Sequence, residues 1–211
     1  MDPFERARVL YEQAVFDGDA DAVPIADQVL DGAEAALSLA RGRIVHARFL
    51  ADRRDDPGEL VLFERAALLY RQLGDLRGEG EALSWVGTYH QVVRDDVSTA
   101  QPFLERAREL AAAAGNKLTL SYAERHLGFC DMATGDLASA RKHFEESVRL
   151  RREIGFMPGV AAGVLALAQL AAKSGDSEHA RELFDEAASI AADSGAHGIE
   201  RWIERARRKD V

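Results

Sequence analysis

The segment ATGDLASARKHFEESVRLRREIG (Ala133–Gly155) occurs again, forty residues later, as KSGDSEHARELFDEAASIAADSG (Lys173–Gly195). Seven positions are identical in the two copies: Gly135/Gly175, Asp136/Asp176, Ala140/Ala180, Arg141/Arg181, Phe144/Phe184, Glu146/Glu186 and Gly155/Gly195. A third copy, VRDDVSTAQPFLERARELAAAAG (Val93–Gly115), aligns with them without gaps. A fixed period of about forty residues predicts a stack of repeated units, each burying its apolar side against the next.

Each unit is predicted to contain two helices. Five residues of one copy are spaced i, i+4, i+7, i+8 and i+11, which is typical of one buried helical stripe: Ala140, Phe144, Ser147, Val148 and Arg151. Gly135 and Asp136 supply a break followed by an acceptor for the next helix N-terminus. No segment alternates with period two over a useful length, so the sequence predicts no strands.

These positions resemble the tetratricopeptide repeat. That family has a small residue at position eight, alanine at twenty, a bulky apolar residue at twenty-four and a small residue at twenty-seven. One unit here matches with Gly128, Ala140, Phe144 and Ser147, and the next matches with Ala168, Ala180, Phe184 and Ala187. The unit is longer than the family's common length of about 34 residues. The resemblance implies an all-α, right-handed α-solenoid of long helix pairs.

The whole chain, residues 1–211, is predicted to form a single repeat domain. Residues 1–32 are interpreted as a degenerate first pair, residues 33–195 as four units, and residues 196–211 as a capping helix with a tail. About eleven helices are expected, at 3–16, 20–31, 33–54, 58–73, 76–94, 97–114, 117–134, 137–154, 158–173, 177–194 and 197–209.

Composition limits the classes of partner and compartment. With 27 Lys and Arg against 36 Asp and Glu, the net charge is −9, which argues against nucleic acid and anionic membranes. The single cysteine, Cys130, forms no intrachain disulfide, and the N-terminal segment lacks the apolar core of a signal peptide. We therefore expect a cytoplasmic protein. Its Ala, Arg and Asp bias suggests a bacterial source.

The resemblance implies a concave groove lined by the first helix of each unit. The partner-binding residues expected there are Arg43, Glu81, Ser84, Trp85, Thr88, Gln91, Tyr122, Arg125, Phe129, Met132, Leu165 and Gln169, with Ala47, Leu50 and Ala172 at further positions of the same kind. Aromatic residues, Met and Arg are enriched in binding patches. The competing interpretation is that these side chains only pack one helix on another.

No catalytic, cofactor or metal site is expected. His126 and Cys130 lie four residues apart on one helical face, but two ligands do not make a structural zinc site. His90 and Asp131 occupy equivalent positions in neighbouring units, and a hydrogen bond between them is expected. The phosphate-loop, nucleophile-elbow and zinc-protease motifs do not occur.

The segment GVAAGVLALAQLAA (159–172) is apolar on all sides, which is typical of a helix that is covered all round. Three covers are open: the capping helix, a second copy of the chain, or a ligand. A homodimer through residues 158–173 or through the C-terminal helix is one expectation.

The sequence favours a non-catalytic scaffold or adaptor that binds a protein or peptide in its groove. The alternatives are a ligand-sensing regulatory subunit that acts through a separate effector, and a self-associating structural protein.

Overall fold

The computed structural model describes residues 1–210, with the side chains of residues 209 and 210 excepted, and is helical almost throughout this range. The helices are α1 (Pro3–Glu12), α2 (Ala22–Asp52), α3 (Gly58–Leu73), α4 (Leu76–Val92), α5 (Val97–Ala113), α6 (Lys117–Thr134), α7 (Leu137–Glu153), α8 (Met157–Lys173), α9 (Ser177–Asp193) and α10 (His197–Asp210), and a π-helical turn, η1 (Gln13–Asp17), extends α1. Residues 1–210 contain no strand, as predicted. Val211, the end of the expected tail, lies outside the described residues.

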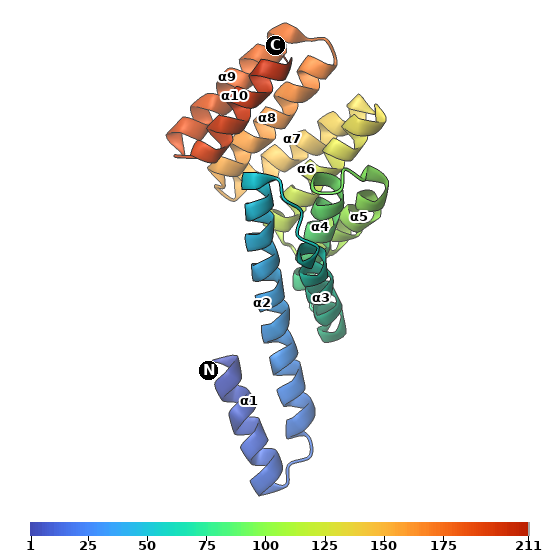
Figure 1. Ribbon diagram of the computed structural model, residues 1–211, viewed down its shortest axis with the longest axis vertical. Helices are drawn as coiled ribbons and strands as arrows, with labels where there is room; N and C mark the ends of the chain where they lie inside the picture. Colours follow the sequence, from blue (N-terminus) through green and yellow to red (C-terminus); the bar gives the residue numbers. More distant parts are fainter. Residues whose placement is uncertain (211) are drawn as a thin grey trace.

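The helices form an α-solenoid, which confirms the predicted fold class. Four antiparallel pairs follow one another, namely α2–α3, α4–α5, α6–α7 and α8–α9, and each pair packs on the next (Figure 1). The last helix, α10, packs on α8 and α9. No helix within residues 1–210 is long and apolar enough to cross a membrane.

Aspartate and glycine set the turns between the helices, as the repeated Gly-Asp dipeptide predicts. The Asp136 side chain accepts a hydrogen bond from the backbone N–H of Ser139, and Asp176 does the same for His179, at 3.0 and 3.2 Å. Gly135 has φ +91°, a left-handed conformation that costs glycine little. Only two residues separate α6 from α7, and three separate α8 from α9.

Small residues let the two helices of a pair approach closely. A Cβ added at Gly128 would lie 2.6 Å from the ring of Phe144, and one at Gly87 would lie 2.6 Å from Leu104. Gly42 faces Phe63 in the same way, at 2.5 Å. The bulky residue of the second helix thus fills the space left by the small residue of the first.

The expected helices 20–31 and 33–54 are one continuous helix, so the structure has ten α-helices in residues 1–210 rather than about eleven. The break expected near Gly32 is wrong. A single glycine costs a helix only about 1 kcal/mol, and its flanking sequence VLD and AEAALSLA favours a helix. Gly32 is absent from the glycines with positive φ.

The capping helix covers the apolar helix α8. Ile203 and Ala206 of α10 are buried in one cluster with Val164 and Ala168 of α8 and Phe184 of α9. This arrangement corresponds to the first of the three covers considered above. The outward residues of α10 are charged, so neither α8 nor α10 presents a broad apolar face to solvent.

Candidate functional site

The concave side of the solenoid forms one cleft of about 940 Å³. Its walls come mainly from the first helix of each pair, α2, α4, α6 and α8, and from α10. A smaller hollow between α2 and α10 is lined by Ala47, Leu50 and Trp202, among others. The curvature of the stack therefore brings the two ends of the solenoid to opposite rims of the same cleft.

All of the residues expected in the groove, except Met132, line this cleft. They are Arg43 of α2; Glu81, Ser84, Trp85, Thr88 and Gln91 of α4; Tyr122, Arg125 and Phe129 of α6; and Leu165 and Gln169 of α8. Leu50 lines it as well, and Ala47 lines the smaller hollow. The helix periodicity thus brings these side chains to one surface.

Met132 is the exception, and its expected place in the groove is wrong. It packs against the cluster of Phe144, Ala166 and Leu170. Ala133 lines the cleft in its place. The reason is the 100° step of the α-helix: from Phe129, four residues return to nearly the same face, whereas three residues fall short of it. Ala172 likewise packs in the cluster beneath α10.

Trp85 lies at the centre of an aromatic group on the α2–α4 wall. Its ring stacks on Phe63 with centroids 5.4 Å apart and meets the His46 ring edge-on at 5.3 Å. The Arg43 guanidinium lies over Trp85 at 5.8 Å and forms an ion pair with Glu81. These contacts hold Trp85 in place, with part of its ring open to the cleft.

Two arginines lie together in the α6–α8 wall. Arg125 lies over the Phe129 ring at 4.6 Å, and Arg151 of α7 lies over Tyr122 at 5.0 Å. Burial lowers the pKa of Arg125 to about 9, helped by the positive charge of Arg151, and burial lowers the pKa of Arg151 to about 10. Both groups remain cationic at neutral pH.

Neither of these arginines is paired with a carboxylate of residues 1–208, the part of the chain whose side chains are described. Arg151 donates to the Gly159 carbonyl at 2.8 Å and to the Ser121 hydroxyl at 3.3 Å, and Arg125 reaches the Ala162 carbonyl only at 3.4 Å. The acidic residues that line the cleft are Glu81 and Asp95, whereas its cations are Arg43, Arg53, Arg125, Arg151 and Arg205. The cleft is therefore locally positive in an acidic chain.

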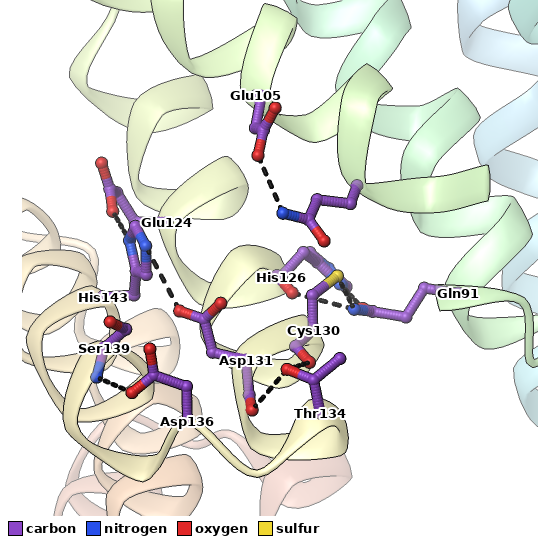
Figure 2. A network of polar contacts seen from close by, with 11 residues as sticks. Gln91, Glu105, Glu124, His126, Cys130, Asp131, Thr134, Asp136, Ser139 and His143 are labelled. Atoms are coloured by element: carbon purple, nitrogen blue, oxygen red, sulfur yellow. Dashed lines mark hydrogen bonds and ion pairs between the residues drawn. The ribbon is translucent and has the colours of Figure 1, made fainter. Parts of the chain in front are cut away.

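Gln91 joins α4 to α6 at the base of the cleft (Figure 2). Its side-chain amide donates to the His126 carbonyl at 2.8 Å, lies 3.1 Å from the Cys130 sulfur, and accepts from the His126 ring at 2.5 Å. Burial, with the nearby charge of Arg125, lowers the pKa of His126 well below its usual value, so the ring is neutral. Burial raises the pKa of the Cys130 thiol to about 11, which makes it unreactive.

The hydrogen bond expected between His90 and Asp131 is absent from the described contacts. His90 stacks on Phe103 with centroids 5.7 Å apart, and Asp131 lies 3.5 Å from the ring of His143. His143 also pairs with the buried Glu124, and Figure 2 shows it between the two carboxylates. The repeat register placed His90 and Asp131 correctly along their helices, but His143 of the neighbouring α7 reaches Asp131 instead.

Several cleft residues were not expected from the sequence. His46, His126 and Arg151 complete the walls, and α10 contributes Ile199, Trp202 and Arg205. The periodicity of α10 indicated an apolar face that includes Trp202, but it carried no signal that this face also reaches the cleft. Among the described residues, no group of three or more His, Cys, Asp or Glu side chains is placed to hold a metal ion.

Comparison with known proteins supports the repeat. Residues 118–193 match the family model described as Tetratricopeptide repeat. A search of curated proteins finds no match. Among the solved structures that resemble the chain is aspartyl phosphate phosphatase F from Bacillus subtilis, with TM-score 0.69, 13% identity and coverage of 97% of this chain and 54% of that one. Another is BtubC from P. vanneervenii, with TM-score 0.49, 15% identity and coverage of 92% of this chain and 88% of that one.

The chain thus spans about half the length of the phosphatase it resembles. At 13% identity this likeness concerns the fold alone.

Proposed function

We propose that this chain, whose residues 118–193 match the tetratricopeptide repeat, is a non-catalytic interaction module whose cleft holds a carboxylate-bearing segment of a protein partner. A volume of about 940 Å³ offers room for a segment of several residues. The contacts within the cleft suggest which chemistry such a segment would have.

The observation that carries the proposal is the pair Arg125 and Arg151 without a carboxylate partner. Desolvation makes an enclosed cation costly, and a carboxylate that binds there would relieve this cost with charge-assisted hydrogen bonds. Arg125 is the more accessible of the two, because Arg151 is only 1% exposed and its Nη1 and Nε already donate to protein oxygens. Arg125 is therefore the group that would bind the acidic residue directly.

Aromatic surface beside the cations supports a peptide rather than a simple ion. Tyr122 and Phe129 flank Arg125, and Trp85 lines the cleft from the neighbouring helix α4. Large, rigid aromatic side chains that are already fixed in place lose little conformational entropy on binding. We expect the partner segment to carry an aliphatic or aromatic residue near its carboxylate.

A peptide-display selection against the full chain tests the proposal. The expected result is enrichment of sequences that combine Asp or Glu with an apolar residue. The Arg125→Gln variant should bind an enriched peptide at least about tenfold more weakly, the effect of losing one charge-assisted contact of roughly 1.5 to 3 kcal/mol. Isothermal calorimetry measures the two affinities.

Arg141→Gln is the matched control, because Arg141 is exposed on α7 and does not line the cleft. It removes the same charge and should leave the affinity unchanged. Equal affinity of the Arg125→Gln variant and the parent chain, with helicity intact, would contradict the proposal.

A further inference from the structure

The helix α2 carries a solvent-exposed apolar stripe that no other part of the described chain covers. Its large residues recur at intervals of seven, and each is between 40 and 58% exposed: Val23, Leu30, Leu37 and Ile44. Alanines follow three residues after each of them: Ala26, Ala33, Ala40 and Ala47. Apolar residues at the first and fourth positions of a heptad are the pattern by which helices pair along their lengths.

A second stripe lies on α1. Phe4, Tyr11 and Val15 are spaced i, i+7 and i+11 and are 64, 61 and 54% exposed. The half-buried residues Ala7, Leu10 and Ala14 turn toward α2 instead. On each of the two helices, the exposed stripe is rotated by roughly 90° about the helix axis from the face that contacts the other helix. Viewed from the N-terminus of each helix, the direction of this rotation is the same.

Because α1 and α2 are antiparallel, these equal rotations bring the two stripes to the same side of the hairpin. Figure 1 shows this hairpin projecting from the stacked pairs, with α1 beside the first half of α2. Beyond α1, the stripe of α2 continues through Leu37 and Ile44. The hairpin therefore presents one largely apolar face, half of it on two helices and half on α2 alone. Arg8 interrupts this face between Phe4 and Tyr11, where it pairs with Glu5 and Glu12.

Charged residues beside the stripe divide by sign along α2. At the positions that follow each alanine of the heptad lie Asp27 and Glu34 in the first half, and Arg41 and Arg48 in the second. If two copies of α2 pair in antiparallel fashion, Asp27 of one copy meets Arg48 of the other. Arg41 then lies opposite Glu34, which also pairs with Arg65 of α3 in its own chain. A parallel pair would set the two copies of this charged row on opposite flanks of the seam, so neither contact would form.

We propose that two copies of this chain associate through antiparallel pairing of their α2 helices. The two-fold axis lies near Leu37 and Ala40. The bare second half of each α2 then packs into the apolar face formed by α1 and α2 of the other copy, and the four helices form a bundle. The alanines allow close approach of the two α2 axes along a seam from Val23 to Ala47 of about 36 Å.

The proposed seam leaves the cleft open. The cleft residues Arg43, His46 and Leu50 lie on a different side of α2 from Leu37 and Ile44, by more than a quarter turn of the helix. Ala47, at the end of the seam, lines the smaller hollow between α2 and α10, so the seam ends beside that hollow without covering the main cleft. The expected homodimer is retained, but its seam moves from the C-terminal helices, whose apolar residues are buried within the chain, to the N-terminal hairpin.

Sedimentation equilibrium of the full chain between 1 and 100 μM tests the proposal. The expected species is a dimer at the upper end of this range. Leu37→Glu should weaken the dimer by at least about a hundredfold, because both copies then place a carboxylate in the apolar seam. Met157→Glu, an equally large change at an exposed position of α8, is the control and should leave the dimer intact. Circular dichroism verifies that each variant is helical.

Charge reversal tests the orientation. Asp27→Arg and Arg48→Asp should each weaken the dimer, because each sets like charges together across the seam. The double variant should recover the affinity of the parent chain. A monomeric parent chain at 100 μM, a dimer that survives Leu37→Glu, or a double variant weaker than both single variants would each overturn the proposal.

Discussion

At the residue scale, the fold depends on small residues that pack against large ones and on buried charged side chains with specific hydrogen-bond partners. Gly128 and Phe144 fill one space together, as do Gly87 and Leu104. Phe144 and Leu104 are fully buried, so neither can move aside for an added methyl group without disturbing the next pair of helices. Such positions tolerate little change in volume.

Gly128→Ala should lower the free energy of unfolding by about 1–3 kcal/mol, because its Cβ would lie 2.6 Å from a buried ring. Urea denaturation followed by circular dichroism measures the change. Gly198→Ala is the control: the nearest atom to its Cβ is Arg201 Nη2 at 4.0 Å, so the alanine should be neutral or slightly stabilising in α10. A neutral Gly128→Ala would mean that the helices of the pair are less closely packed than described.

His143 gives a pH dependence with a defined sign. The hydrogen bond with Glu124 raises the pKa of His143 above its usual 6.5, despite partial burial. The contribution of the His143–Glu124 pair to the stability of the folded protein is therefore fully present below pH 6.5. It is lost as the pH rises through the raised pKa of His143 in the folded protein. The free energy of unfolding of the parent chain, minus that of His143→Gln, should fall between pH 6 and pH 8.

Taking the difference between the two proteins removes the effect of His126. The pKa of that buried ring is lowered, so it contributes a dependence of opposite sign, but it does so equally in both proteins. A difference that stays constant across this pH range would show that the His143–Glu124 pair does not stabilise the folded protein.

At the scale of the element, each helix is defined by its ends and by the helix that covers it. Five helices, α4 to α7 and α9, are capped by the side chains of Asp75, Asp96, Asn116, Asp136 and Asp176. The final helix, α10, has a different role, because it covers α8 and also supplies Trp202 to the cleft. A terminal helix that is apolar on one face and charged on the other lets a solenoid end without an exposed core.

Ile203→Ala tests the role of α10. Ile203 is only 2% exposed, and its truncation should lower the free energy of unfolding by about 2–5 kcal/mol. Hydrogen exchange should show loss of protection first in α10 and then in α8. Glu204→Ala changes the adjacent exposed residue and should have little effect. Unchanged protection in the Ile203→Ala variant would show that α10 is not needed to cover α8.

At the scale of the whole molecule, curvature separates two electrostatic environments. The chain has a net charge of −9, yet five arginines and two acidic residues line its cleft. Charges separated by more than a Debye length of about 10 Å are largely screened, so a ligand in the cleft responds mainly to the charges that line it.

Binding of an acidic peptide to the cleft should therefore weaken with salt. Between 50 mM and 500 mM NaCl we expect the affinity to fall by roughly tenfold, equivalent to about 1.4 kcal/mol, because screening reduces the attraction between Arg125 and the peptide carboxylate. Calorimetry across this range measures the slope, and a neutral analogue with Gln in place of Glu is the control. An affinity independent of salt would place the peptide outside the positive cleft.

The sequence by itself determined the helix pairs, their order and the face that each first helix turns to the cleft. These properties depend on contacts within one period: glycine and aspartate at the turns, a small residue opposite a bulky one, and a 3.6-residue repeat of apolar positions. For this reason Tyr122, Arg125 and Phe129 could be placed on one surface in advance. Met132 was placed wrongly because it lies three residues after Phe129, whereas the residue four positions after Phe129, Ala133, reaches the cleft.

Only the tertiary structure decided which residues from distant periods meet. The position of α10 across the cleft from α2 depends on the rotation of each helix pair relative to the previous pair. These small rotations add up along the solenoid, and no local sequence pattern specifies the total. The same holds for Arg151 beside Arg125 and for His143 beside Asp131, since each contact depends on how two helices cross.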